Sequence, residues 1–293
     1  MGYIGFTERG DAGIDLRWKD KLENTNNIDG AVLITKRITD KFIKTVLDLS
    51  KPVVVHANCT GWGGTAIEPG AAPYSEQLQM LNKLIELGFD VNRCVIRIDP
   101  IIPTSEGLSR LGAVLNAIPN YKYFDLDKMR IRFSVLDMYP HVKERFKKIQ
   151  RDIRETVPYG YDASLFPQGQ TNPPTMVGFD DPYHGKFYAS QEQFVSVYDV
   201  LKEYAPSDRA HLYETCAEPA MIAIDEQQDK QILKATGCLS EADYTAMNLT
   251  KPNISAVNGQ NRHGCLCLRT KTELFPARPI HGCALKCAYC YWK

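Results

Sequence analysis

The final stretch of the chain carries cysteines at a spacing that suits metal chemistry. Cys283, Cys287 and Cys290 fall within eight residues, in the pattern C-x3-C-x2-C. Thiolates bind zinc and iron–sulfur clusters, and three of them are one short of the four that a closed tetrahedral site uses. On a cubic 4Fe-4S cluster, three thiolates would leave one iron open to bind a substrate. A zinc site is the alternative for the same triplet.

Four more cysteines could form a second centre. Cys216, Cys238, Cys265 and Cys267 also lie in the last third of the chain. Four thiolates satisfy a fully ligated auxiliary 4Fe-4S cluster, which is our prediction. A structural zinc site and simple buried thiols are the alternatives.

The remaining cysteines, Cys59 and Cys94, are expected to pack as small hydrophobic side chains. A disulfide framework is not expected, because the N-terminal sequence shows no secretion-type signal.

The composition is that of an ordinary globular protein. Hydrophobic residues make up 44% of the 293 residues and charged residues 24%, and no apolar run approaches membrane-spanning length. We therefore expect a cytoplasmic protein without a membrane partner. The formal net charge of zero leaves a nucleic-acid partner open, because a local groove can be basic on a neutral chain. The motifs of nicotinamide-binding, P-loop, zinc-protease and serine-hydrolase proteins are absent from the sequence.

Short apolar runs alternate with longer helical patterns, which predicts an α/β protein. The expected strands are Tyr3–Thr7, Ala31–Thr35, Pro52–Ala57, Cys94–Ile98, Ile131–Leu136 and Ala210–Thr215. The expected helices are Asp40–Leu49, Ser75–Leu87, Glu106–Ala117, His141–Glu155 and Gln191–Tyr204. Because the strands are almost continuously apolar, they fit a parallel sheet buried on both faces, in a barrel or a doubly wound fold.

Chemistry is expected in the loops at the carboxyl ends of the strands, where α/β folds place their sites. Four charged residues at strand ends are our catalytic candidates: Arg97, Asp99, Asp137 and Glu214. A structural ion pair is the competing role for Arg97 and Asp99, and helix capping competes for Asp137. His56, on an apolar strand, is expected to be a core residue.

Two parts of the chain break the alternation of strands and helices. Residues 157–190 are dense in Gly, Pro and Tyr, which predicts either a lid over the site or a plain surface insertion. Residues 238–293 lack the β–α rhythm and carry most of the clustered cysteines. We therefore divide the chain into a barrel over residues 1–237 and a cysteine-rich cap over residues 238–293 that completes the barrel mouth.

The terminal CALKCAYCY resembles the cluster motif of the radical S-adenosylmethionine (radical SAM) superfamily, and the triplet is similar to that of spore photoproduct lyase, a DNA-repair member. The resemblance implies that Cys283, Cys287 and Cys290 hold a 4Fe-4S cluster whose open iron binds S-adenosylmethionine. Reductive cleavage of this cofactor then gives a 5′-deoxyadenosyl radical, which abstracts hydrogen. Tyr289 matches the aromatic residue of family members and is expected beside the adenine.

The position of the triplet departs from this superfamily, whose members usually carry it after the first barrel strand. The order makes sense if the barrel is circularly permuted, with YIGFTERGDAG as the second strand and its loop. Family members often place a glycine-rich, acidic segment there against the methionine part of the cofactor. Glu8, Arg9, Gly10 and Asp11 are the expected counterparts.

A closer resemblance covers most of the chain. RIDPII, FSVLDMY, ETCAE, the later GC, GCLCL and the triplet resemble, in this order, a largely uncharacterised bacterial and phage-associated family. This family is a domain of unknown function with a C-terminal radical-SAM-like cysteine cluster. The resemblance implies the architecture and leaves the reaction open.

The sequence thus predicts a (β/α)6-like partial TIM barrel, circularly permuted, that acts as a radical SAM enzyme with one or two 4Fe-4S clusters. Its expected partners are S-adenosylmethionine, an external reductant such as flavodoxin or ferredoxin, and a substrate. A nucleic-acid base or nucleotide is our first choice of substrate, and a peptide or small metabolite is the second. The rival functions are a zinc-stabilised binding protein and an electron-transfer protein with two closed clusters.

Overall fold

A computed structural model describes most of the chain. It covers residues 2–156, 189–205, 213–216, 218–250, 270–275 and 282–290, together with residues 266 and 268. Nearly all of the predicted lid lies outside the described residues, and so do Cys265 and Cys267.

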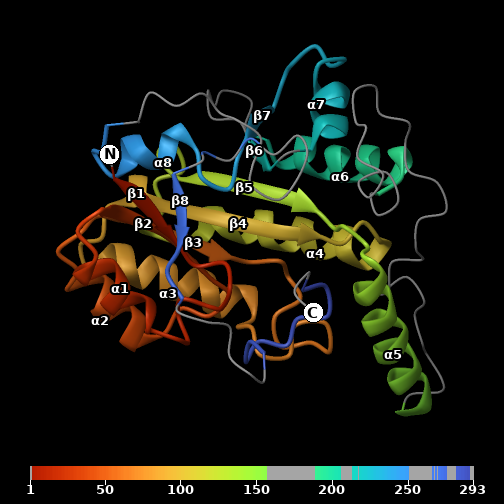
Figure 1. Ribbon diagram of the computed structural model, residues 1–293. Coiled ribbons are helices and arrows are strands. Elements are labelled where there is room, and N and C mark those ends of the chain that lie inside the picture. Colours follow the sequence, from red (N-terminus) through yellow and green to blue (C-terminus); the bar gives the residue numbers. More distant parts are fainter. Residues whose placement is uncertain are drawn as a thin grey trace.

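One parallel sheet of eight strands forms the framework (Figure 1). Its strands are β1 (Tyr3–Phe6), β2 (Ile28–Thr35), β3 (Val53–Asn58), β4 (Cys94–Ile101), β5 (Arg130–Val135), β6 (Tyr213–Cys216), β7 (Leu233–Thr236) and β8 (Lys271–Glu273). The order across the sheet is β7-β6-β5-β4-β3-β2-β1-β8. Because the order never reverses, the sheet is not doubly wound. β/α barrels share this order, but the pairs formed by the described residues do not join β7 to β8.

The predicted number of six strands is wrong, because β7 and β8 extend the sheet at its two edges. Both are short and partly polar, with the sequences LKAT and KTE, so hydrophobic periodicity gives no signal for them. They form because a neighbouring strand offers backbone partners: β7 pairs with β6, and β8 pairs with β1. The six predicted strands are present, with ends within about three residues of the prediction.

The described residues also form eight α-helices. These are α1 (Trp18–Asn24), α2 (Asp40–Leu47), α3 (Tyr74–Glu86), α4 (Ser105–Ala117), α5 (Pro140–Thr156), α6 (Gln191–Tyr204), α7 (Pro219–Asp225) and α8 (Glu241–Ala246). Thr39 and Thr104 cap α2 and α4 by accepting a backbone N–H with their hydroxyl groups. All five predicted helices are present; α1, α7 and α8 are too short to show a clear period. In the part of the chain that the structure describes, no helix has the length and apolar character to cross a membrane.

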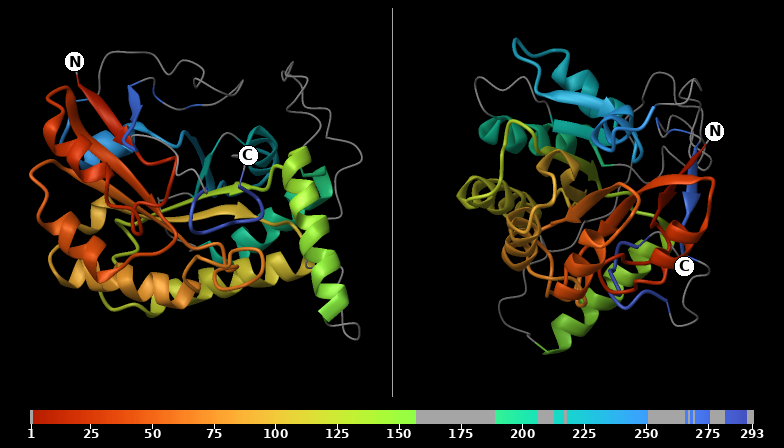
Figure 2. Two further views of the ribbon diagram at one scale, coloured as in Figure 1. Left: turned by 60° about the horizontal axis from the view of Figure 1, so that its bottom comes forward. Right: turned by 90° about the vertical axis from the view of Figure 1, so that its left-hand side faces the viewer.

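The two faces of the sheet are covered differently. The outer face packs against α1–α4, α6 and α7 in the main hydrophobic core, to which β3 contributes Val53 and Val55. Figure 2 shows α2, α3 and α4 along this side of the strands. Alternate side chains such as Val54 point to the inner face, where α8 adds Tyr244 and Met247. Toward the carboxyl ends of the same strands the buried inner face becomes polar.

Candidate functional site

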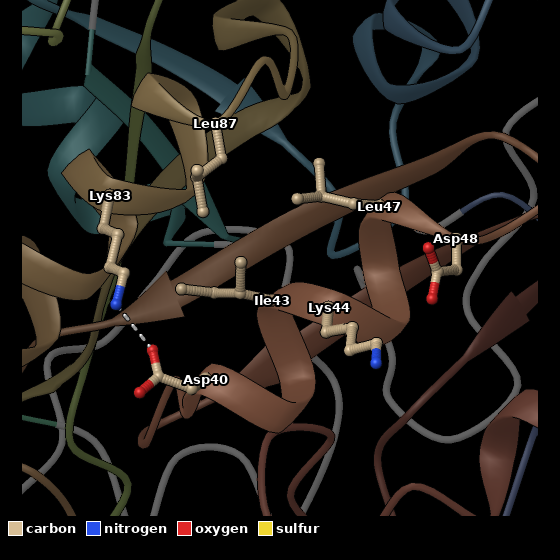
Figure 3. Close-up of a pocket in the computed structure, with 7 residues that line it drawn as sticks. All are labelled: Asp40, Ile43, Lys44, Leu47, Asp48, Lys83 and Leu87. Atoms are coloured by element: carbon tan, nitrogen blue, oxygen red, sulfur yellow. Dashed lines mark hydrogen bonds and ion pairs between the residues drawn. The ribbon is translucent and has the colours of Figure 1, made fainter.

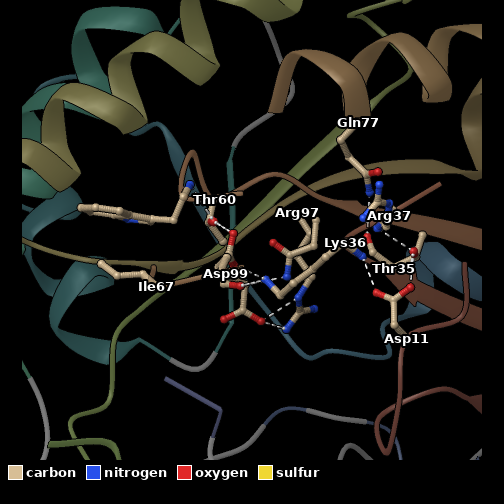
Figure 4. Close-up of polar contacts among 12 residues, drawn as sticks. Asp11, Thr35, Lys36, Arg37, Thr60, Ile67, Gln77, Arg97 and Asp99 are labelled. Carbon is tan, nitrogen blue, oxygen red and sulfur yellow. Dashed lines mark hydrogen bonds and ion pairs between the residues drawn. The ribbon is translucent and has the colours of Figure 1, made fainter. Parts of the chain in front are cut away.

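Four polar side chains meet on the inner face at the carboxyl ends of β2, β3 and β4. They are Lys36, Asn58, Arg97 and Asp99, here called the central polar cluster. Asn58 and Arg97 are register partners on β3 and β4, so their side chains stand next to each other on the same face. Asn58 Nδ2 donates to the backbone oxygen of Asp99 at 2.8 Å, and Lys36 Nζ donates to the same oxygen at 3.1 Å. Figure 4 shows Lys36 and Arg97 directed toward Asp99.

Asp99 is the centre of this cluster and is held as a carboxylate. Arg97 Nε and Nη2 donate to Asp99 Oδ2 at 2.7 and 2.5 Å, and the Ser134 hydroxyl donates to Oδ1. Burial by itself would raise the pKa of Asp99, but the charge of Arg97 and the bond from Ser134 outweigh it and lower this pKa below its ordinary value. The carboxylate side chain still keeps 26% of its surface exposed. The ion pair that was the competing role for Arg97 and Asp99 is therefore present, and the side chain of Asp99 stays partly exposed.

Lys36 links the central polar cluster to the cysteine segment, residues 282–290. Its Nζ lies 3.0 Å from Glu68 Oε1, while the Thr60 hydroxyl donates to Glu68 Oε2 at 2.6 Å. The same ammonium lies 5.1 Å from the ring centroid of Tyr289. Burial would lower the pKa of Lys36, but the charge of Glu68 reverses the effect and raises the pKa. A permanent positive charge thus separates Asp99 from Tyr289.

The cysteine segment is docked at the carboxyl ends of the strands. Gly70 N donates to Leu285 O at 3.1 Å, and Ala288 N donates to Ile67 O at 2.9 Å. Arg145 of α5 donates to the backbone oxygen of Cys290. The rings and aliphatic chains of this region form a separate apolar cluster, which includes Trp62, Ile67, Leu136, Val142, Phe146, Ala288 and Tyr289. The loop after β3 and the start of α5 therefore hold the segment in place.

The three thiols of this segment suit a cluster in their chemistry. Cys283, Cys287 and Cys290 are all half-buried thiols. Burial raises the pKa of Cys287, so this thiol has to lose a proton when it binds a metal. Three thiols from one loop form the donor set that an iron–sulfur cluster uses. Among the described residues, however, no three His, Cys, Asp or Glu side chains already surround a common metal position.

Two of the four cysteines predicted for a second centre lie together. Cys216 at the end of β6 and Cys238 just beyond β7 have their sulfur atoms 3.9 Å apart. Arg97 Nη2 lies 3.6 Å from the sulfur of Cys238, so the pair borders the central polar cluster. Cys265 and Cys267 belong to the part of the chain that is not described. The second centre therefore stays a prediction.

Glu214 belongs to a buried charge network beside the central polar cluster, because Asn58, Arg97, Arg132 and Glu214 are register partners on successive strands. Arg132 Nε and Nη2 lie 2.7 and 2.6 Å from Glu214 Oε2, and Arg132 Nη1 lies 3.5 Å from Asp243 Oδ2. Arg130 Nη1 lies 2.8 Å from Asp243 Oδ1. Burial by itself would raise the pKa of Asp243, but Arg132 and Arg130 lower it well below its ordinary value. The network ties α8 to β5 and β6, which is a structural role for Glu214.

His56 lies in the same layer and is a core residue, as expected. Its side chain is fully buried, and neither ring nitrogen has a hydrogen-bond partner. The closest charged group is Asp243, with Oδ1 3.7 Å from His56 Nε2. Burial lowers the pKa of His56 to about 3, so the imidazole is neutral in the folded protein at neutral pH.

Asp11 fixes the loop after β1 to the end of β2. Its Oδ1 accepts from Gly13 N at 3.0 Å and from the Thr35 hydroxyl at 2.8 Å, and its Oδ2 accepts from Lys36 N at 2.6 Å (Figure 4). Burial raises the pKa of Asp11 despite these bonds. The contacts place Asp11 behind Lys36 and give it a positioning role. A direct contact with a cofactor stays a prediction.

The other predicted cofactor residues lie against β8. Glu8 Oε1 accepts from Lys271 Nζ at 2.8 Å, while the backbone N–H groups of Glu8 and Arg9 donate to Glu273 Oε2 at 3.1 Å each. A Cβ on Gly10 would lie 3.0 Å from the ring of Phe275. The loop after β1 is thus packed onto the strand that precedes the cysteine segment.

Asp137 lies half-buried in the loop between β5 and α5. Sequence reasoning did not select Lys36, Glu68 or Ser134. Strand alternation could have found Lys36 and Ser134, because each continues the inner-facing series at the end of its strand. Glu68 follows a loop without regular structure, so its contact with Lys36 comes from tertiary packing alone.

A surface depression of about 280 Å³ lies elsewhere, between α2 and α3 on the outer layer (Figure 3). It is lined by Asp40, Ile43, Lys44, Leu47, Asp48, Lys83 and Leu87. Its aliphatic lining comes from Ile43, Leu47 and Leu87 on the facing sides of α2 and α3. The Lys83–Asp40 ion pair at its rim is solvent-exposed. This depression contains none of the predicted site residues.

Neither a model of a known protein family nor a curated protein matches this chain. The function therefore has to be argued from the chemistry of the site itself.

Replacing Glu214 by Gln is expected to lower the free energy of unfolding by about 3 kcal/mol, because Arg132 would remain buried with one partner lost. The matched control is Glu106→Gln, which breaks an exposed ion pair with Arg110 and should cost less than about 1 kcal/mol. Urea denaturation measures both. Equal losses in the two variants would show that the buried network adds nothing.

Stability should depend on pH through His56. The folded-state pKa of about 3 lies below the unfolded value of about 6.5, so between these values the unfolded chain binds one more proton. The contribution of His56 to the free energy of unfolding is therefore fully present above pH 6.5 and is lost as the pH falls toward 3. From pH 7 to pH 5 the wild type should lose about 2 kcal/mol more than His56→Gln, measured by urea denaturation. Parallel pH profiles for the two proteins would contradict the assignment.

Proposed function

We propose that this chain is a circularly permuted radical SAM enzyme. The observation that carries the proposal is the place of the cysteine segment. It follows β8, which lies beside β1, and it packs at the carboxyl ends of the strands next to the central polar cluster. Counted from β8, the strands run in order across the whole sheet to β7. A cysteine loop after the first strand of such a series matches the arrangement that the family resemblance implies.

In this proposal the sheet is a barrel-like wall, and the cysteine segment caps its mouth. Cys283, Cys287 and Cys290 hold a 4Fe-4S cluster. When bound, the cluster supplies the electron that cleaves S-adenosylmethionine, and a flavodoxin- or ferredoxin-type reductant supplies it in turn. Tyr289 and the loop of Glu8–Asp11 would contact this cofactor. Cys216 and Cys238, together with Cys265 and Cys267, hold the auxiliary cluster.

The central polar cluster serves the substrate side of the site. Arg97 and Ser134 orient the carboxylate of Asp99 and keep it ionised, and its exposed fraction leaves it open to a substrate. Lys36 keeps a positive charge beside Tyr289. Asp137, in the next loop, completes the set of acidic residues at this end of the sheet. Glu214 acts through Arg132 as a positioning residue.

Helix α5 favours a nucleic acid as the substrate. Its 17 residues include six Lys or Arg and three Asp or Glu, which leaves the rest of the chain with 29 basic and 32 acidic residues. One side of the helix buries Val142 and Phe146 in the apolar cluster of the cysteine segment. Lys143, Lys147 and Arg151 follow at four-residue steps on the exposed side. These three side chains span about 12 Å of the helix beside the site, a length over which they can contact successive phosphates of a nucleic-acid strand.

The cluster assignment is tested with protein purified and reconstituted without oxygen. Wild type should contain iron and sulfide and form 5′-deoxyadenosine from S-adenosylmethionine after dithionite reduction, whereas Cys287→Ala should lose at least about 99% of this product. Cys94→Ala removes a thiol that is fully buried on the outer face and should keep the activity. Zinc without iron in the wild type, or equal activity in both variants, would contradict the proposal.

The basic face of α5 is tested by binding of a labelled single-stranded oligonucleotide, measured as fluorescence anisotropy at several salt concentrations. The triple variant Lys143→Gln, Lys147→Gln and Arg151→Gln should lower the slope of log K against log salt by about 2, because three phosphate contacts are lost. The control changes three exposed lysines of α2 and α3: Lys41→Gln, Lys44→Gln and Lys83→Gln. A control with the same loss, or a wild type that does not bind at low salt, would remove nucleic acid as the substrate.

A further inference from the structure

Two atoms of the central polar cluster are buried without a hydrogen-bond partner. They are Oδ1 of Asn58 and Nη1 of Arg97, and the two residues are only 6% and 5% exposed. A buried polar atom without a partner is costly, and native proteins contain few of them. These two lie on register partners of adjacent strands, beside the partly exposed side chain of Asp99.

The other polar atoms of both side chains form hydrogen bonds, and these bonds identify which free atom is a donor and which is an acceptor. Asn58 Nδ2 donates to the backbone oxygen of Asp99, so the free atom of this amide has to be its carbonyl oxygen, an acceptor. Arg97 Nε and Nη2 donate to the carboxylate of Asp99, so its free Nη1 is a donor. The two register partners therefore offer one acceptor and one donor on the same face of the sheet.

We propose that Asn58 and Arg97 bind the cis-amide edge of a planar ring in the substrate. Arg97 Nη1 donates to the ring carbonyl oxygen, and Asn58 Oδ1 accepts from the adjacent ring N–H. An ordinary peptide bond does not fit, because a trans amide directs its C=O and N–H to opposite sides. Thymine, uracil and guanine carry the required edge, and enzymes that act on a base contact this Watson–Crick edge. The inference rests on the proposed function for the radical chemistry and names the group that the same site recognises.

The surroundings favour a neutral ligand of this kind over a charged one. The carboxylate of Asp99 lies next to both residues and repels an anion, while the charge of Arg97 repels a cation. The location is not sealed, since Asp99 keeps 26% of its side chain exposed and Cys216 and Cys238 are half-buried. Tyr289 presents a third atom without a partner, its buried hydroxyl, from the cysteine segment.

The test compares two nucleosides that differ by one methyl group. Binding of thymidine and of N3-methylthymidine to the full chain, reconstituted without oxygen, is measured by calorimetry. We expect thymidine to bind at least about tenfold more tightly, because methylation removes the N–H that Asn58 accepts. N-methylacetamide, a trans amide, should not compete with thymidine. Equal affinity for both nucleosides, no binding of thymidine, or competition by N-methylacetamide would overturn the inference.

Two variants show which residues are responsible. Arg97→Lys keeps a positive charge for Asp99 but removes Nη1, and should weaken thymidine binding at least about tenfold. Arg93→Lys makes the same substitution at an arginine that pairs with Asp90 just before β4, and should change binding less than about twofold. An equal loss in both variants would overturn the inference, since it would reflect a general effect of the substitution.

The outcome is separable from that of the radical SAM proposal, because binding needs no turnover. If 5′-deoxyadenosine forms but the two nucleosides bind equally, only the recognition of the ring edge is wrong. If thymidine is preferred but the protein holds zinc and no iron, only the radical chemistry is wrong.

Discussion

The charges on the inner face of the sheet lie among packed strands, where an ion without a partner would cost several kcal/mol. Each one is therefore matched: Arg97 with Asp99, Arg132 with Glu214, and Arg130 with Asp243. Arg97, Arg132 and Glu214 are register partners on β4, β5 and β6, so these pairs form one layer across the three strands. The same layer contains the candidate site. It also fixes α8, which supplies Asp243 and closes the inner face.

On the β3 and β4 side of this layer the requirement for pairing is met only in part. Asp99 has three donors and stays partly exposed, whereas Asn58 and Arg97 each keep one buried atom without a partner. Glu214 is paired with Arg132 and is 4% exposed, whereas Asp99 keeps 26% of its side chain exposed.

Lys36 connects the sheet to the terminal cysteines. Its ammonium contacts Glu68, the backbone of Asp99 and the ring of Tyr289, three segments that are distant in sequence. A single charge thus helps to align the loop after β3, the end of β4 and the cysteine segment. Helix α5, which carries the basic row, contacts the same segment through Arg145. The proposed cofactor chemistry, substrate recognition and nucleic-acid binding thus involve adjacent parts of one end of the sheet.

The sequence by itself determined the elements with a strong hydrophobic period. Six strands and five helices follow from it, because burial on a sheet or a helix face selects apolar residues at spacings of two or of three to four. The spacing of the terminal thiols could also be read from the sequence, since C-x3-C-x2-C is a local pattern. Arg97 and Asp99 could be chosen because inner-facing positions at a strand end follow from alternation.

The tertiary structure decided what depends on distant partners. β7 and β8 have little apolar pattern and form only because β6 and β1 provide hydrogen-bonding edges. The order that places β8 beside β1 packs residues 271–275 against the first loop, and no local signal states this. The roles of Glu214, Lys36 and Asn58 depend on which charged group lies opposite each of them. Residue type and spacing leave that choice open, because an ion pair or hydrogen bond between distant segments exists only once the strands have paired.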